Sequence, residues 1–144
     1  MVSVGLVTYN QVRFIGQAVR SVLAQQTPFP IELVIGDDCS TDGTTNLLRA
    51  LAAEHPNTIR LLTRERNLGF ARNSLDVIAH CRGEYLACLD GDDYWTTTDG
   101  LARQVAYLRA HPECVLCFGR ADYLLDPTGK VYPGVVGPDR KSVV

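Results

Sequence analysis

Four short apolar runs, each followed by a polar loop and then by a helical pattern, constrain the fold of this chain most. The runs are Val2 to Val7, Ile31 to Ile35, Thr58 to Thr63 and Tyr85 to Leu89. Short continuous apolar runs are typical of strands that are buried on both faces of a parallel sheet. Because parallel neighbours need crossover connections, the alternation predicts an α/β fold: a doubly wound, mostly parallel sheet with helices on both faces.

The segments between these runs have apolar residues at helical spacing. The four expected apolar faces are Ile15, Ala18, Val19, Val22 and Leu23; Leu47, Leu48, Leu51 and Ala52; Phe70, Val77, Ile78 and Cys81; and Leu101, Val105 and Leu108. We also expect a fifth strand at Val115 to Phe118, and a hairpin that joins Asp122 to Leu125 with Val131 to Tyr132. Residues 1–125 are therefore predicted to form one domain, and residues 126–144 a weak hairpin or a mobile C-terminal end.

Composition excludes several classes of function. The 144 residues carry a net charge of -2 and have a pI near 5.9, which argues against a nucleic-acid surface. No apolar stretch approaches the length of a transmembrane segment or resembles a signal peptide. We therefore expect a cytoplasmic location, with membrane association left open for a longer parent chain. The glycine-rich phosphate loops of P-loop enzymes and NAD enzymes are absent.

Polar residues gather where the predicted strands end. Asp90, Asp92 and Asp93 follow the fourth run, and Gly91 allows the tight turn between them. The carboxyl ends of parallel strands meet at one edge, so the loops at residues 8–10, 37–38 and 64–72 are expected beside this turn. Crowded carboxylates repel one another, and a divalent cation, or water and protonation, relieves the repulsion. Oxygen ligands favour Mg²⁺ or Mn²⁺, while a solvated acidic turn remains the alternative.

This edge suits a ligand with a base and a diphosphate. A cation held by carboxylates reverses their repulsion of phosphate, and arginines clamp phosphate oxygens. Arg72 is the first choice for such a clamp, followed by Arg64 and Arg66, although each of them also fits an ordinary surface role. Tyr9 can stack on a base, or it can serve only to pack the end of a strand.

Four motifs, in order, resemble those of family 2 glycosyltransferases with the GT-A fold. They are Val7-Thr8-Tyr9-Asn10; Ile35-Gly36-Asp37-Asp38-Cys39-Ser40-Thr41-Asp42-Gly43-Thr44; Asn67-Leu68-Gly69 with Ala71-Arg72-Asn73; and Leu89-Asp90-Gly91-Asp92-Asp93-Tyr94-Trp95. The resemblance covers about residues 2–125 and implies a Rossmann-like GT-A domain that binds a nucleotide sugar. The donor implied is a UDP-sugar, held with Mn²⁺ or Mg²⁺.

The resemblance also implies roles for individual residues. Thr8, Tyr9 and Asn10 would line the nucleoside pocket, and Asp38 would bond the base. Arg72 would lie near the diphosphate, and Asn67 and Gly91 would complete the donor-binding set. Asp90 and Asp92 would form the metal-binding pair, with Asp92 the direct ligand and Asp90 nearer the ribose. Thr8 departs from the family, which often has proline at this position.

The acceptor half of such enzymes, which supplies the catalytic base, normally follows the region where this sequence ends. We therefore expect a truncated, donor-binding half of an inverting glycosyltransferase of polysaccharide biosynthesis, with its general base beyond Val144. The acceptor implied is a saccharide or a lipid-linked saccharide. The alternative is a noncatalytic nucleotide-sugar binding module. A phosphoacceptor signalling domain also gathers aspartates at strand ends, but its site needs a lysine at a later strand. This class is disfavoured, because Lys130 and Lys141 are the only lysines and both lie in the weakly patterned terminal region.

Overall fold

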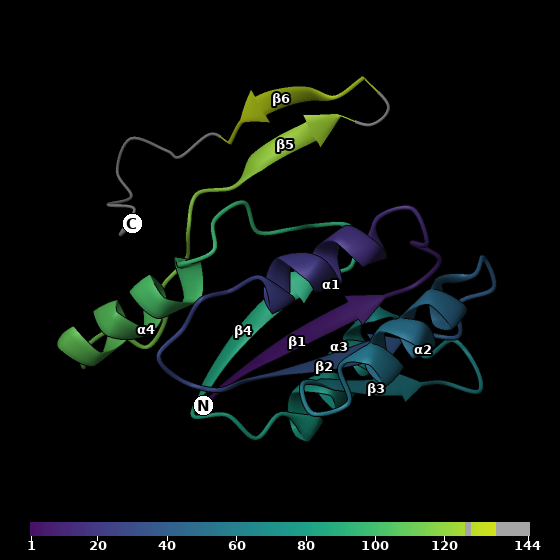
Figure 1. Cartoon of the computed structure of the whole chain (residues 1–144), viewed down its shortest axis with the longest axis horizontal. Helices are drawn as coiled ribbons and strands as arrows, with labels where there is room; N and C mark the ends of the chain where they lie inside the picture. Colours follow the sequence, from purple (N-terminus) through teal and green to yellow (C-terminus); the bar gives the residue numbers. More distant parts are fainter. Residues whose placement is uncertain (126–127, 135–144) are drawn as a thin grey trace. The chain divides into compact units, whose positions relative to one another are not determined.

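A computed structural model describes residues 1–125 and 128–134 (Figure 1). The elements, in order, are β1 (Val2–Thr8), α1 (Ile15–Leu23), β2 (Ile31–Asp37), α2 (Thr44–Glu54), β3 (Ile59–Thr63), α3 (Phe70–His80), β4 (Tyr85–Asp90), α4 (Gly100–Ala110), β5 (Asp122–Leu125) and β6 (Lys130–Pro133). The chain divides into two compact units, Met1–Thr98 and Asp99–Val144.

The first unit is built on a four-stranded sheet with the order β3-β2-β1-β4. All three pairs are parallel, and β1 runs in register with β2 from Val2 opposite Ile31 to Thr8 opposite Asp37. The central strands β1 and β2 are buried along almost their whole length, and Val4, Leu6 and Leu33 are fully buried. The α/β class and the parallel sheet are therefore as predicted from the sequence.

Helices cover both faces of this sheet: α1 and α2 lie on one face, and α3 lies on the other (Figure 1). The packing of α3 against β1 and β2 is close because Gly36 of β2 has no side chain. A Cβ atom at Gly36 would lie 2.5 Å from both Asn73 Oδ1 and Val77 Cγ2. Gly36 therefore allows α3 to reach the backbone of β2.

A second close approach joins the amino-terminal ends of the strands. Ser3 Oγ donates a hydrogen bond to the buried carboxylate of Glu32, which also accepts one from the Arg82 backbone N–H at 2.6 Å. The Arg82 guanidinium lies 3.3 Å from the same carboxylate. A Cβ atom at Gly83 would lie 2.5 Å from Ser3 N, so the turn before β4 requires glycine here. Glu32 thus ties β1, β2 and this turn together.

Two expectations about apolar segments are wrong. Val115 to Phe118 is not a strand, and the side chains of Val115, Leu116 and Phe118 are exposed. In the described part of the chain this segment has no paired neighbour, and an unpaired strand leaves its backbone groups unsatisfied. Helix α3 turns Phe70 and Ile78 to solvent, while Asn73 and Val77 are the residues that it buries. A hydrogen bond from Asn73 to Gly36 O of β2, together with those that Asn73 accepts from Arg64, allows this polar residue to be buried.

The second unit contains α4 and an antiparallel hairpin of β5 and β6, in which Asp122 lies opposite Pro133. This hairpin is as predicted, although β6 is longer than expected. The predicted mobile end falls mostly on residues 135–144, outside the described residues. None of the helices described in the chain is both long and apolar enough to cross a membrane.

Candidate functional site

An open cavity of about 470 Å³ lies in the first unit, at the carboxyl ends of β1, β2 and β4 and beside the start of α3. It is lined by Val7, Thr8, Tyr9, Gln11, Asp38, Asn67, Gly69, Phe70, Asn73, Asp90 and Asp92. The parallel direction of the strands brings these residues together, since each strand delivers its following loop to the same edge.

The loops after β1 and β2 hold each other. Asn10, with a positive φ of 54°, donates its backbone N–H to Ser40 Oγ and accepts the Thr41 N–H at its side-chain oxygen, both at 2.8 Å. Asp42 accepts the Val12 and Thr44 N–H groups. Burial raises the pKa of Asp42, but these bonds and that of the Thr44 hydroxyl bring it below its usual range.

The two neighbouring aspartates at the end of β2 have different surroundings. Asp37 is buried beneath the loop and accepts hydrogen bonds from the hydroxyls of Ser40 and Thr45. Asp38, 3% exposed, lines the cavity and accepts the backbone N–H groups of Leu68 and Gly69 at 2.7 and 2.9 Å. Asp38 therefore holds the loop before α3 as one wall of the cavity.

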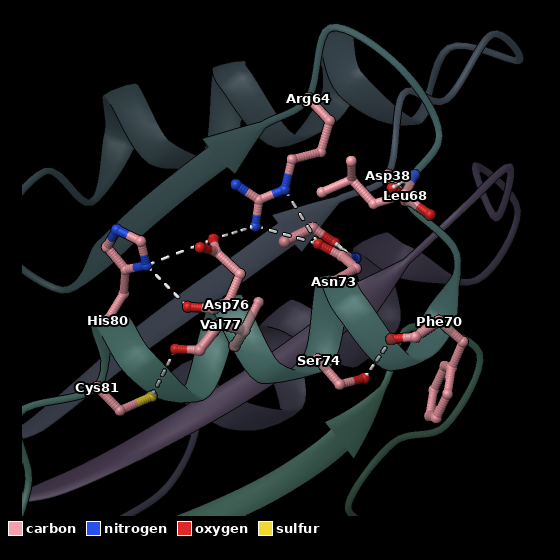
Figure 2. A network of polar contacts seen from close by, with 11 residues as sticks. Asp38, Arg64, Leu68, Phe70, Asn73, Ser74, Asp76, Val77, His80 and Cys81 are labelled. Atoms are coloured by element: carbon pink, nitrogen blue, oxygen red, sulfur yellow. Dashed lines mark hydrogen bonds and ion pairs between the residues drawn. The ribbon is translucent and has the colours of Figure 1, made fainter.

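A polar network supports the same wall from behind (Figure 2). Asn73 is 2% exposed, donates to Gly36 O at 2.8 Å, and accepts from Arg64 Nε and Nη2 at 3.2 and 3.1 Å. Arg64 Nη2 also lies 2.7 Å from Asp76 Oδ2, and His80 Nδ1 lies 3.4 Å from the same oxygen. Arg64 is therefore engaged on α3, where it ties the loop to the helix.

The acidic turn after β4 packs closely against the loop after β1. Gly91 donates its N–H to Val7 O at 2.9 Å, and a Cβ atom at Gly91 would lie 2.7 Å from Thr8 Oγ1 and 2.5 Å from Gln11 Oε1. Position 91 therefore requires glycine, because a larger residue would collide with Thr8 and Gln11. Asp90 and Asp92, on either side of Gly91, both line the cavity.

Two carboxylates of this turn, Asp90 and Asp93, have raised pKa values. Burial raises the pKa of Asp90, and the negative charge of Asp92 raises it further. For Asp93, burial again comes first, followed by the charges of Asp92 and Asp90. A cation placed among these groups would offset both causes, because it favours the charged form of each carboxylate.

The donor set suits a hard divalent cation that shares its coordination with a ligand. Within residues 1–125 and 128–134, no group of three or more His, Cys, Asp or Glu side chains is arranged to hold a metal. Mg²⁺ commonly binds through one or two carboxylates together with substrate phosphates, without an all-protein cage. Asp90 and Asp92 on one cavity wall match this mode of binding.

Of the residues predicted from the sequence to bind donor or metal, six line the cavity. They are Thr8, Tyr9, Asn67, Asp38, Asp90 and Asp92. Asn10 instead connects two loops through hydrogen bonds, Gly91 is buried within the acidic turn, and Arg72 is exposed on α3 outside the cavity lining. Their functional roles stay predictions.

Sequence reasoning missed several cavity residues, including Gln11, Phe70 and Asn73. Phe70 and Asn73 lie at the start of α3, where the family motif gave a signal that could have been used. Gln11 follows the first motif directly, but its place beside Gly91 depends on the conformation of the loop.

The family model for glycosyl transferase family 2 matches residues 3–135. The protein Rv1520 of Mycobacterium tuberculosis is 44% identical over 116 residues, which are 81% of this chain and 34% of that protein. Among solved structures, the mannosyltransferase PcManGT of Pyrobaculum calidifontis, in complex with GDP-Man and Mn²⁺, has a TM-score of 0.72 and 31% identity over 83% of this chain and 35% of its own.

TarS of S. aureus, in complex with UDP-GlcNAc, has a TM-score of 0.67 and 27% identity, and the match covers 77% of this chain and 32% of that chain. The chain therefore spans about one third of the length of the proteins that it matches. The four motifs, the parallel sheet with helices on both faces and the cavity at its carboxyl edge agree with the match of the family model. This chain belongs to glycosyl transferase family 2.

Proposed function

We propose that this chain binds the nucleotide-sugar donor of a glycosyltransferase, in the cavity at the carboxyl edge of the sheet, together with a divalent cation. The observation that carries the proposal is that Asp38 and the pair Asp90 and Asp92 line one cavity of about 470 Å³, within the usual size range for small-ligand pockets. One part of this cavity can take a polar base, and another can take a cation with phosphates.

Roles within the cavity follow from the chemistry of each group. Asp38 keeps carboxylate lone pairs beyond the two backbone bonds that it accepts, so it can also accept an N–H from a base. Tyr9 is 48% exposed and offers a ring face for stacking. Asp92 would hold the cation directly, with Asp90 nearer the ribose, and Arg72 would approach the diphosphate from α3.

The cation, Mn²⁺ or Mg²⁺, would neutralise the charge that develops on the departing diphosphate. The protein side chains fix the donor so that the anomeric carbon faces an acceptor hydroxyl, which is a large part of such catalysis. We propose inverting transfer from a UDP-sugar to a saccharide or lipid-linked acceptor. The three carboxylates of the cavity, Asp38, Asp90 and Asp92, all have donor or metal roles, so the acceptor's base must be another group.

The comparisons support the binding of a nucleotide sugar, but they do not identify the sugar. PcManGT was solved with GDP-Man and Mn²⁺, and TarS with UDP-GlcNAc, so two proteins of similar fold bind nucleotide sugars with different bases. A noncatalytic nucleotide-sugar binding module is the second candidate. It is favoured by the absence of an unassigned carboxylate among the residues described as lining the cavity.

The proposal is tested by calorimetry of the chain with UDP and with GDP, each in Mn²⁺ and in excess chelator. We expect one of the two nucleotides to bind in Mn²⁺ and to lose at least about ten-fold in affinity in chelator, since uncompensated carboxylates repel the diphosphate. Asp92→Ala should abolish the effect of Mn²⁺. Glu54→Gln, which removes an exposed charge at the end of α2, is the matched control and should bind as the wild type does.

Equal affinity in Mn²⁺ and in chelator would contradict the metal site, and absence of binding to either nucleotide would contradict the proposed function. The two candidate functions are separated by incubating the chain with labelled UDP-GlcNAc and GDP-mannose, Mn²⁺ and saccharide acceptors. A metal-dependent product on an acceptor, lost in Asp92→Ala, would exclude the noncatalytic module.

A further inference from the structure

Phe70 is an exposed aromatic residue on the wall of the cavity, and neither the motifs nor the family resemblance gives it a role. It is the first residue of α3 and is 70% exposed. Asn73 and Val77, three and seven positions further on, are buried against the sheet, so Phe70 belongs to the same stripe of the helix. Because this stripe extends beyond the end of the strands, Phe70 lines the cavity instead of the core.

The backbone around Phe70 is held firmly. Gly69, with a φ of 83°, donates its N–H to Asp38 Oδ2 at 2.9 Å, and the carbonyl of Phe70 accepts from Ser74 Oγ at 2.8 Å. A ring carried by an anchored helix end can contact a ligand at a small entropic cost, since an aromatic side chain has only two χ angles to fix. The position of Phe70 is therefore suited to recognition.

The cavity has a closed part and an open part. Asp38 and Thr8 are 3% and 4% exposed, whereas Phe70 is 70% exposed and Asp92 is also exposed. In Figure 2 the Phe70 side chain points away from Asp38 and Asn73. If the base is bound at Asp38, the reacting carbon of the donor must lie on the open side, where an acceptor can reach it. Phe70 stands on that open side.

We propose that Phe70 packs against the ring of the transferred sugar and thereby contributes to the choice of donor. A pyranose ring has one face rich in C–H groups, and an aromatic ring that covers it removes apolar surface of both partners from water. The inference rests on the proposed function, because it requires a nucleotide sugar in this cavity. It adds a sugar contact to a site whose other assigned groups meet the base, the phosphates and the cation.

The test compares Phe70→Ala with the wild type in binding to a nucleotide sugar and to the bare nucleotide, by calorimetry in Mn²⁺. The probes are UDP-GlcNAc with UDP, and GDP-mannose with GDP. We expect Phe70→Ala to weaken binding of the nucleotide sugar about five- to ten-fold while binding of the bare nucleotide stays unchanged. Leu75→Ala, which removes an apolar side chain that is 68% exposed on the same helix and outside the cavity, is the matched control.

Each possible result either supports or contradicts a contact between Phe70 and the sugar. Equal weakening of nucleotide and nucleotide sugar would place the ring on the nucleoside and overturn the sugar contact, and no change in either would overturn any role in binding. A wild-type chain that binds no nucleotide would instead refute the proposed function itself. Phe70→Tyr, which keeps the ring, should retain nucleotide-sugar affinity, and thermal unfolding should show the same midpoint for all variants because the side chain is exposed.

Discussion

The aspartates of the cavity region differ in what they hold. Asp37 accepts hydrogen bonds from its own loop and from α2, and Asp42 accepts them from the loop after β1 and from the start of α2. Asp38 holds the loop before α3, and Asp90 and Asp92, on either side of Gly91, line the cavity. The sequence indicated that these residues gather at one edge. The pattern of strands alone did not separate the adjacent Asp37 and Asp38, since their surroundings depend on loop conformations such as the positive φ of Asn10. The family resemblance did select Asp38, which is the one of the two that lines the cavity.

The first prediction concerns Asp38 in the free protein. Asp38→Ala removes the acceptor of the Leu68 N–H and one of the two acceptors of the Gly69 N–H, and a hydrogen bond to a charged group is worth about 1.5 to 3 kcal/mol. We expect amide hydrogen exchange at Leu68 to become at least about ten-fold faster, and exchange at Gly69 to rise less because Asn67 Oδ1 still accepts its N–H. Glu65→Ala, at an exposed position of the same loop, should leave exchange unchanged. Unchanged exchange in Asp38→Ala would show that the loop is held by other contacts.

At the scale of elements, continuous apolar runs predicted the positions of the four parallel strands. Burial on both faces, which such runs also indicated, is found in the central strands β1 and β2, whereas the edge strands β3 and β4 are partly exposed and Leu86 of β4 is 44% exposed. The same criterion failed at Val115 to Phe118, since apolar composition does not specify a pairing partner. The prediction of the buried face of α3 failed for another reason. Its buried face includes Asn73, which is polar and bonded to Gly36 O, so a search for apolar spacing could not find that face.

The second prediction concerns the Glu32 connection between β1, β2 and the turn before β4. Burial raises the pKa of Glu32, but hydrogen bonds from Ser3 and Arg82 and the Arg82 charge outweigh it, so the net pKa is lowered. A carboxyl whose pKa is lower in the folded state stabilises the protein above its unfolded-state pKa of about 4.3. This stabilisation is lost as the pH falls through the folded-state pKa.

Urea unfolding of the wild type and of Glu32→Gln at several pH values measures this contribution. Near neutral pH we expect Glu32→Gln to be less stable by about 1.5 to 3 kcal/mol, because charge-assisted bonds to Ser3 and Arg82 are weakened. The difference should shrink below about pH 4, where the wild-type carboxyl also becomes protonated. Glu84→Gln, an exposed neighbour, is the control. A difference that does not depend on pH would show that the charge of Glu32 plays no part.

At the scale of the whole molecule, all residues that line the cavity belong to the first unit, Met1–Thr98. Four loops from separate stretches of the sequence meet there, and parallel topology alone was sufficient to predict their meeting. The sugar and the acceptor could not be predicted in this way, because they depend on the shape of the bound complex and not on the order of motifs. The proposed function therefore depends on the binding of a nucleotide through a cation at this edge.

Nuclear magnetic resonance of the labelled chain with nucleotide and Mn²⁺ can locate this binding site, since the paramagnetic ion broadens signals near the place where it binds. We predict that Mn²⁺ with UDP or GDP broadens the amide signals of Asp90, Gly91 and Asp92 far more than Mn²⁺ alone does. Mg²⁺ should shift the same signals without broadening them. Arg82 and Gly83, before the opposite end of β4, should stay sharp. Broadening centred elsewhere, or equal broadening in Asp92→Ala, would contradict binding of the nucleotide through a cation at Asp90 and Asp92.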